Sequence, residues 1–78
     1  IYFLLEDYES ALQDASQAIT FAPDDPALYE GRCNAYLLLE RWAEGIADCE
    51  TALELDPTWE YQPETQDLLT QAYQEIKK

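Results

Sequence analysis

The feature that most constrains this chain is an internal repeat with a period of 34 residues. When the sequence is shifted by this period, aromatic residues fall on aromatic ones, small residues fall on small ones, and Pro23 falls on Pro57. The matched pairs include Tyr2 with Tyr36, Leu4 with Leu38, Tyr8 with Trp42, Ala11 with Gly45, and Ala18 with Ala52. A period of roughly 20–50 residues is typical of solenoids, in which each repeat is one supersecondary unit that stacks on the next.

Local signals within the repeats predict helices. Asp25 is a good N-cap, and the fixed φ of Pro26 suits the first turn of a helix. From Pro26 to Leu39 apolar residues recur at spacings of three and four, until the Glu40–Arg41 pair breaks the pattern. Similar patterns predict helices over residues 8–21 and 42–55, and a last helix over residues 63–77 that follows a three-residue insertion within residues 58–62. No stretch alternates like a strand, so the chain is predicted to be all-α.

The repeat resembles the tetratricopeptide repeat. That family has an aromatic and a small residue in its first helix, small residues in its second helix and a closing proline, which in the complete repeat are Tyr29, Cys33, Tyr36, Gly45, Cys49, Ala52 and Pro57. The resemblance implies a right-handed superhelix of antiparallel helix pairs, with about two repeats and a closing helix. We expect one domain over residues 1–78, divided into a partial repeat (1–23), a complete repeat (24–57), and an insertion with the closing helix (58–78).

Two residues depart from the family pattern. Arg32 stands where an apolar residue is usual, and Gly45 replaces alanine. Glycine disfavours a helix interior by about 1 kcal/mol relative to alanine, but it keeps the small volume that close helix packing needs. We therefore expect Gly45 to lie where the two helices of the complete repeat approach each other most closely.

Charge and composition exclude several functions. The chain has 17 acidic and 4 basic residues, a formal net charge of −13 and no histidine. This charge repels phosphate, so nucleic acids and anionic membranes are poor partners. The chain has no histidine for a serine–histidine pair and no glycine-rich phosphate loop, and 78 residues are too few to build the deep cleft that paired catalytic carboxylates need. We therefore expect neither an enzyme nor a cofactor. A hydrophobic content of 47% argues for a folded domain and against a disordered acidic tail.

Cys33 and Cys49 lie on the two helices of the complete repeat. One reading is a redox pair or half of a metal site, and the other is a pair of small residues packed between the helices. A zinc site lacks ligands, because the chain has no third thiol and no histidine. With only two cysteines and no visible signal peptide, we expect a cytoplasmic setting and buried, slowly reacting free thiols.

Trp59 and Tyr61 fall in the insertion and have no counterpart in the repeat. They either pack over the end of the last helix or form an exposed contact site. In the related family, the first helix of each repeat lines an inner groove that takes an extended peptide or a partner helix. The partner-binding residues that the resemblance implies here are Phe3, Leu4, Glu30, Asn34, Leu37, Glu64, Asp67, Leu68 and Gln71, and the groove also includes Ala27, Gly31, Leu38 and Glu75.

This groove implies a scaffold or adaptor that binds a partner protein or peptide. Its mixture of acidic and apolar residues predicts a partner that is basic, or mixed basic and apolar. For Leu38 and Leu68 the alternative is contact with the next repeat. For the whole chain the alternative is a structural segment of a longer repeat array, which has no partner of its own.

The stretch Leu28–Tyr36 and the pair Asp48–Cys49 resemble the co-chaperone branch of the family. Those proteins grip the acidic C-terminal tail of heat-shock chaperones with Lys, Asn and Arg side chains. The central Asn position here is Gly31, and the Lys and Arg positions of the next repeat are Glu64 and Leu68. Gly, Glu and Leu cannot donate charge-assisted hydrogen bonds to a carboxylate, so we expect this chain not to bind such a tail.

Overall fold

A computed structural model describes residues 7–78, which form four helices and no strand. Helix α1 spans Tyr8–Phe21, α2 spans Pro26–Leu38, α3 spans Trp42–Leu55 and α4 spans Pro63–Ile76. The predicted all-α class is therefore confirmed. Each helix begins at its predicted residue, and α2 and α4 each end one residue earlier than predicted. The expected groove residues Phe3 and Leu4 lie outside the described residues.

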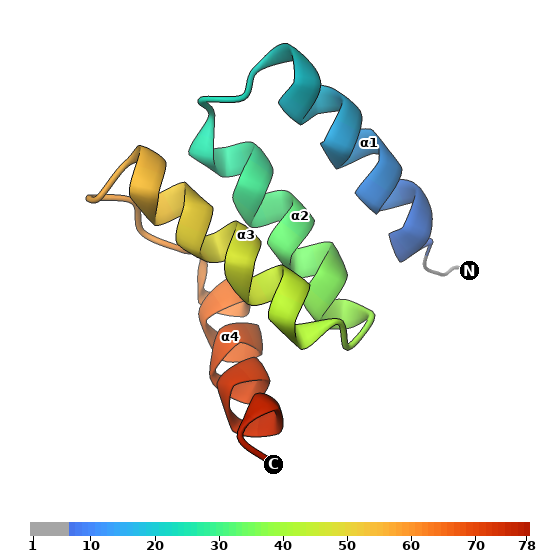
Figure 1. Ribbon diagram of the computed structural model, residues 1–78, viewed down its shortest axis with the longest axis vertical. Coiled ribbons are helices and arrows are strands. Elements are labelled where there is room, and N and C mark those ends of the chain that lie inside the picture. The colour runs from blue at the N-terminus through green and yellow to red at the C-terminus, as the bar shows by residue number, and fades with distance from the viewer. Residues whose placement is uncertain (1–6) are drawn as a thin grey trace.

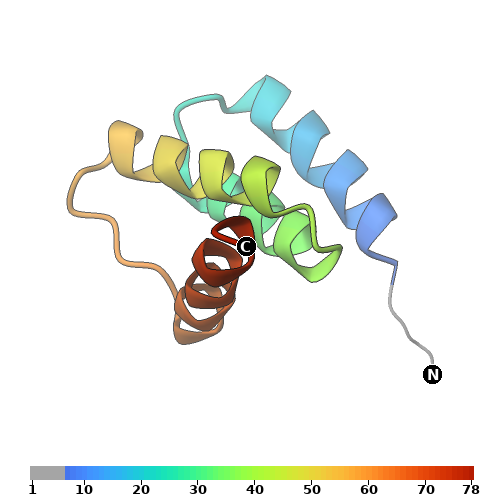
Figure 2. The ribbon, with the colours of Figure 1, turned by 60° about the horizontal axis from the view of Figure 1, so that its bottom comes forward.

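Helix α2 lies at the centre of the arrangement (Figure 1). Helices α2 and α3 form an antiparallel pair, with α1 beside α2 and α4 crossing the pair (Figure 1). Among the four helices of residues 7–78, α1 contacts α2 alone, whereas α4 contacts both α2 and α3. Figure 2 shows α1 and α4 on opposite sides of the α2–α3 pair. The result is a slab of 33 × 31 × 19 Å.

Aspartate side chains cap the first two helices. The Asp7 carboxylate accepts a hydrogen bond from the Ser10 backbone N–H at 3.1 Å, and Asp25 accepts one from the Ala27 N–H at 3.0 Å. Such caps satisfy first-turn donors that have no partner within the helix, and each typically contributes about 1 kcal/mol. Hydrogen bonds from the hydroxyl and the backbone N–H of Ser10 also lower the pKa of the Asp7 carboxyl group.

Helix α2 ends in a tight turn built on Glu40. The N–H of Arg41 bonds to the Tyr36 carbonyl at 2.9 Å, and the N–H of Glu40 bonds to the Leu37 carbonyl at 3.0 Å. These two bonds form a Schellman motif, whose C′ residue takes the left-handed backbone conformation. Glu40 has a φ of 63°, which glycine would adopt more easily. The turn therefore stops α2 at the predicted Glu40–Arg41 break and leads the chain back into α3.

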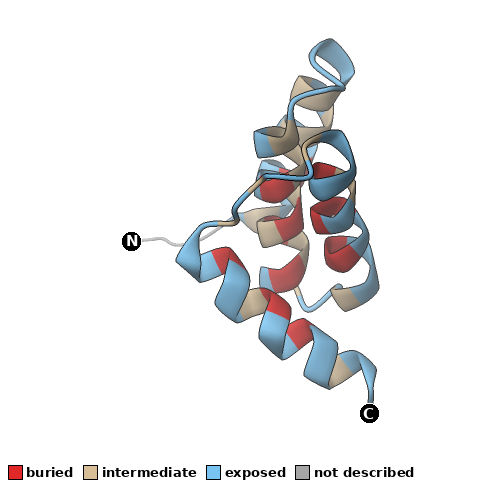
Figure 3. Ribbon diagram, turned by 90° about the vertical axis from the view of Figure 1, so that its left-hand side faces the viewer, coloured by how far each residue is buried: buried red, intermediate tan, exposed pale blue. Residues whose placement is uncertain are grey.

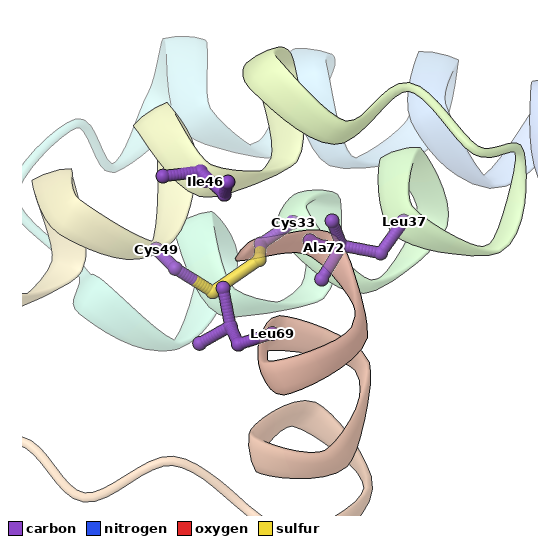
Figure 4. Close-up of a cluster of buried hydrophobic side chains, with 6 residues drawn as sticks. All are labelled: Cys33, Leu37, Ile46, Cys49, Leu69 and Ala72. Atoms are coloured by element: carbon purple, nitrogen blue, oxygen red, sulfur yellow. A yellow bond between two sulfur atoms is a disulfide. The ribbon is translucent and has the colours of Figure 1, made fainter. Parts of the chain in front are cut away.

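The core lies where α2, α3 and α4 meet (Figure 3). Its buried side chains are Cys33, Leu37, Ile46, Cys49, Leu69 and Ala72 (Figure 4). At Gly45 an added Cβ would lie 2.5 Å from Cδ2 of Leu37 and 3.2 Å from the Cys33 carbonyl oxygen. The close approach expected at Gly45 is confirmed, because a larger residue there would force α3 away from α2.

Cys33 and Cys49 form a disulfide between α2 and α3, so the prediction of free thiols is wrong. Their predicted burial is confirmed, because they are 0% and 1% exposed. Their Cα atoms are 5.6 Å apart, within the range of roughly 4.4–6.8 Å that a disulfide needs. Gly45 lies one helical turn before Cys49, and the close packing that it permits brings the two sulfur atoms within bonding reach.

Arg32, which departs from the family pattern, links three helices. Its Nε lies 2.7 Å from Oδ2 of Asp48 on α3, and its Nη2 lies 2.9 Å from Oδ1 of the same residue. Its Nη1 donates to Oγ of Ser16 on α1 at 3.1 Å. The hydrogen bond to Asp48 raises the pKa of Arg32 above its already high ordinary value. A paired charge with several hydrogen bonds thus joins α1, α2 and α3 at a position where the family usually has an apolar residue.

Candidate functional site

A pocket lies between the first half of α2 and the segment that leads into α4. Its volume is about 290 Å³, and its lining residues are Ala27, Glu30, Gly31, Asn34, Trp59 and Gln62. We call it the α2 pocket. The four residues from α2 are spaced at i, i+3, i+4 and i+7, so they share one face of the helix. The structure thus brings together four of the expected groove positions and adds two residues from outside that set.

The Glu30 carboxylate is the polar centre of this region, and Glu30 is only 5% exposed. Its Oε1 accepts a hydrogen bond from Nε1 of Trp59 at 3.0 Å. Its Oε2 accepts one from the Gln62 backbone N–H at 2.9 Å and one from Oγ1 of Thr65 at 2.6 Å. A buried carboxylate needs such donors to replace the water that it has lost. Glu30 therefore holds α4 and the preceding segment against α2, and it still contributes to the lining of the α2 pocket.

The Thr65 hydroxyl lies between Glu30 and Asn34 and is fully buried. Its Oγ1 is 2.8 Å from Oδ1 of Asn34 as well as close to Glu30. A hydroxyl has one proton to donate, and the charged carboxylate is the stronger acceptor. If the Thr65 proton goes to Glu30, the Asn34 carboxamide satisfies Thr65 best with its oxygen and nitrogen exchanged. Its NH₂ group then donates to the Thr65 oxygen, and its carbonyl oxygen is free to accept another hydrogen bond.

Trp59 and Tyr61 are both half-buried. Tyr61 packs against the core, and its hydroxyl donates to the Cys49 carbonyl of α3. Burial raises the pKa of the Tyr61 phenol above its ordinary value, which already lies well above neutral. Of the two roles considered for these aromatics, packing describes Tyr61. Trp59 both anchors its segment to Glu30 and lines the α2 pocket.

The other expected groove residues lie in different surroundings. Leu37 is 1% exposed and belongs to the core, so it faces Gly45 and offers a partner almost no surface. Leu68 is half-buried against the same core. Leu38 is 44% exposed. On α4 the exposed residues of the set are Glu64, Asp67 and Gln71, while Glu75 is half-buried and lies 3.2 Å from Nζ of Lys78.

Sequence reasoning missed Trp59 and Gln62 as pocket residues. The only signal for Trp59 was a large aromatic residue in a non-helical insertion, with no counterpart in the repeat. Gln62 gave no signal, because its place in the pocket follows from the path of residues 56–62 between α3 and α4. That path depends on contacts with Glu30, which lies about thirty residues earlier in the chain.

Within residues 7–78 no three His, Cys, Asp or Glu side chains are grouped so that they could hold a metal ion. The four helices described here are also too short or too polar to cross a bilayer.

Comparison with known proteins gives one family match. Residues 26–59 match the model of the tetratricopeptide repeat. The chain is 40% identical to sperm-associated antigen 1 of Mus musculus over 55 residues, which is 70% of this chain and 6% of that protein. It is 36% identical to Hsp70-Hsp90 organizing protein 2 of Arabidopsis thaliana over 58 residues, which is 74% of this chain and 10% of that protein.

A third relative carries an enzyme name. The chain is 40% identical to serine/threonine-protein phosphatase 5 of Homo sapiens over 55 residues, which is 70% of this chain and 11% of the phosphatase. The chain thus spans about a tenth or less of the length of these three relatives. No solved structure matches the chain significantly.

Proposed function

Because this chain belongs to the tetratricopeptide-repeat family, we propose that it is a protein-interaction module that binds a partner segment at the α2 pocket and the adjoining surface of α4. The observation that carries this proposal is the pocket, which four expected groove residues of α2 help to line. The side of the pocket opposite α2 is formed by Trp59 and Gln62, and their hydrogen bonds to Glu30 hold it in place before any partner arrives. A wall that is already ordered lowers the entropy cost of binding.

The partner segment is basic, or mixed basic and apolar. The chain carries a net charge of −13, and no Lys or Arg lines the pocket. Glu60 and Glu64 are exposed and flank Gln62 in the sequence. Leu38 follows Asn34 by one turn of α2 and supplies exposed apolar surface. Charge of opposite sign speeds the encounter and selects partners, whereas apolar contacts supply most of the affinity.

An acidic chaperone tail is a poor ligand for this surface. The name of Hsp70-Hsp90 organizing protein 2 connects that relative with Hsp70 and Hsp90. In this chain the positions that correspond to the tail-binding Asn, Lys and Arg of the co-chaperone branch are Gly31, Glu64 and Leu68. Because Glu64 repels a carboxylate and the other two cannot donate side-chain hydrogen bonds to it, the proposed partner differs from such a tail.

A structural role within a longer repeat array is the second candidate. The observation that favours it is apolar surface on the outer helices. Tyr73 and Ile76 on α4 are 42% and 52% exposed, and Phe21 at the end of α1 is 88% exposed. Neighbouring repeats bury surface of this kind when they stack. This role requires no ligand at the α2 pocket, so a binding experiment separates the two candidates.

The proposal predicts that Glu64→Lys weakens the binding of a short synthetic peptide of alternating arginine and leucine. We expect the dissociation constant to rise about fivefold at low salt, which corresponds to about 1 kcal/mol. The measurement is isothermal titration of the peptide into the parent chain and into each variant. Raising the salt from about 0.1 M to about 1 M should weaken binding to the parent, because the Debye length falls from about 10 Å to about 3 Å.

Glu9→Lys is the matched control. Glu9 is also exposed and also lies in the first turn of its helix, but α1 contributes no residue to the pocket. Both variants change the net charge equally and lose the same favourable interaction with a helix N-terminus. Equal weakening by both variants would show that only the overall charge matters. Unchanged binding in Glu64→Lys, or no binding to the parent, would count against the proposal and favour the structural role.

A further inference from the structure

The floor of the α2 pocket is open at Gly31. A Cβ placed on this residue would meet no heavy atom within 4 Å, unlike the crowded Cβ position at Gly45. The pocket volume of about 290 Å³ is just below the usual range for small-molecule sites, which is roughly 300–1,000 Å³. The space therefore suits one long side chain rather than a whole peptide.

The walls of the pocket offer hydrogen-bond acceptors and a negative charge. Among residues 7–78, Oε1 of Glu30 accepts a hydrogen bond from Trp59 alone, although a carboxylate oxygen can accept two hydrogen bonds. The Asn34 carbonyl is free to accept one more when its NH₂ group faces Thr65. Glu30 is buried and Asn34 and Trp59 are half-buried, and a charged hydrogen bond is stronger in partly buried surroundings than at an open surface.

The chain supplies no cation of its own to this pocket. All four basic residues fall within residues 7–78. Arg32 pairs with Asp48, Arg41 with Glu44 and Lys78 with Glu75. Lys77 caps the far end of α4. The charge of Glu30 is thus held by neutral donors only, and a cation from another molecule would complete its surroundings.

Trp59 adds an aromatic wall next to these acceptors. Tryptophan is the best aromatic residue for contact with a cation, and the planar guanidinium of arginine can stack on it while its N–H groups bond to acceptors at the edge. Lysine has a compact, strongly hydrated charge and cannot combine these contacts as well. We propose that the α2 pocket receives an arginine side chain of the partner, an inference that rests on the proposed function and narrows it.

The test uses Nα-acetyl-arginine amide as the probe and the corresponding citrulline amide as its neutral analogue. The readout is the NMR signal of the Trp59 indole N–H, which is told apart from that of Trp42 by the variant Trp59→Phe. We expect a saturable shift with the arginine derivative and a dissociation constant on the order of 1 mM, as suits one side chain. The citrulline derivative should bind about tenfold more weakly, because it lacks the charge.

Gly31→Met should abolish the saturable shift, because its side chain fills the pocket. The helix should tolerate it, since the site is open and Met is a better helix former than Gly. Ala43→Met is the control, because Ala43 is exposed on α3 and outside the pocket. Far-UV circular dichroism and thermal melting confirm that both variants are folded.

A linear shift without saturation, an equal response to both probes, or a response that survives in Gly31→Met would overturn this inference. Its failure can be told apart from failure of the proposed function. If the arginine–leucine peptide binds the parent in a Glu64-dependent way while the amide does not enter the pocket, only the arginine assignment is lost. If the amide binds the pocket but no peptide binds the chain, the proposed interaction function is lost instead.

Discussion

Glu30→Ala is expected to lower the free energy of unfolding by about 3 kcal/mol. The substitution removes the acceptor of three hydrogen bonds, from Trp59, Gln62 and Thr65. A hydrogen bond to a charged group contributes roughly 1.5–3 kcal/mol, but the three losses do not add, because water can reach the half-buried Trp59. Urea unfolding followed by circular dichroism measures the change.

A second readout locates this effect. Hydrogen exchange at the Gln62 amide should become faster in Glu30→Ala, because that N–H loses its only acceptor in residues 7–78. Glu54→Ala is the control: Glu54 is an exposed acid on α3, and its removal should change stability by less than about 0.5 kcal/mol. If Glu30→Ala unfolds at the same urea concentration as the parent, the carboxylate does not hold the segment between α3 and α4.

Reduction of the Cys33–Cys49 disulfide should also lower the free energy of unfolding by about 3 kcal/mol. The two cysteines are 16 residues apart, and a cross-link that closes a loop of about this length restricts the unfolded chain by that amount. This is a large share of the total free energy of unfolding, which is roughly 5–15 kcal/mol for a small domain. Unfolding curves with and without a phosphine reductant measure the difference, after mass spectrometry has verified the reduced state.

The double variant Cys33→Ala/Cys49→Ala is the control for this measurement. It should be less stable than the oxidised parent, and its unfolding curve should not respond to the reductant. An unfolding curve of the parent that stays the same after verified reduction would contradict the expected contribution of the cross-link.

Local signals were sufficient to predict the helices. The Asp25–Pro26 start and the Glu40–Arg41 break each act on the backbone within a few residues, so the predicted bounds agree with the structure to within one residue. The need for Gly45 was also predictable, because the repeat places a small residue there, and the structure shows a Cβ clash with Leu37.

Contacts between residues far apart in the chain were not predictable in this way. Cys33 and Cys49 read as two small apolar residues, and only the distance between their Cα atoms shows that they can be joined. Glu30 was predicted as a partner-binding acid of the groove. Its burial could not be predicted, because two of its three hydrogen-bond donors, Trp59 and Gln62, come from an insertion that follows no repeat pattern. The same insertion places Trp59 in the pocket, so the site could be predicted only for its α2 half.

The central claim is that the α2 pocket is the surface at which a partner binds. The most direct test maps the backbone amide shifts of the ¹⁵N-labelled chain during titration with the arginine–leucine peptide. The account predicts that the largest shifts fall on Gly31, Asn34, Trp59 and Gln62, while exposed residues of α1 and α3 such as Gln13 and Glu54 stay nearly unchanged. The claim is contradicted if the largest shifts lie on α1 and α3 while the four pocket residues do not move.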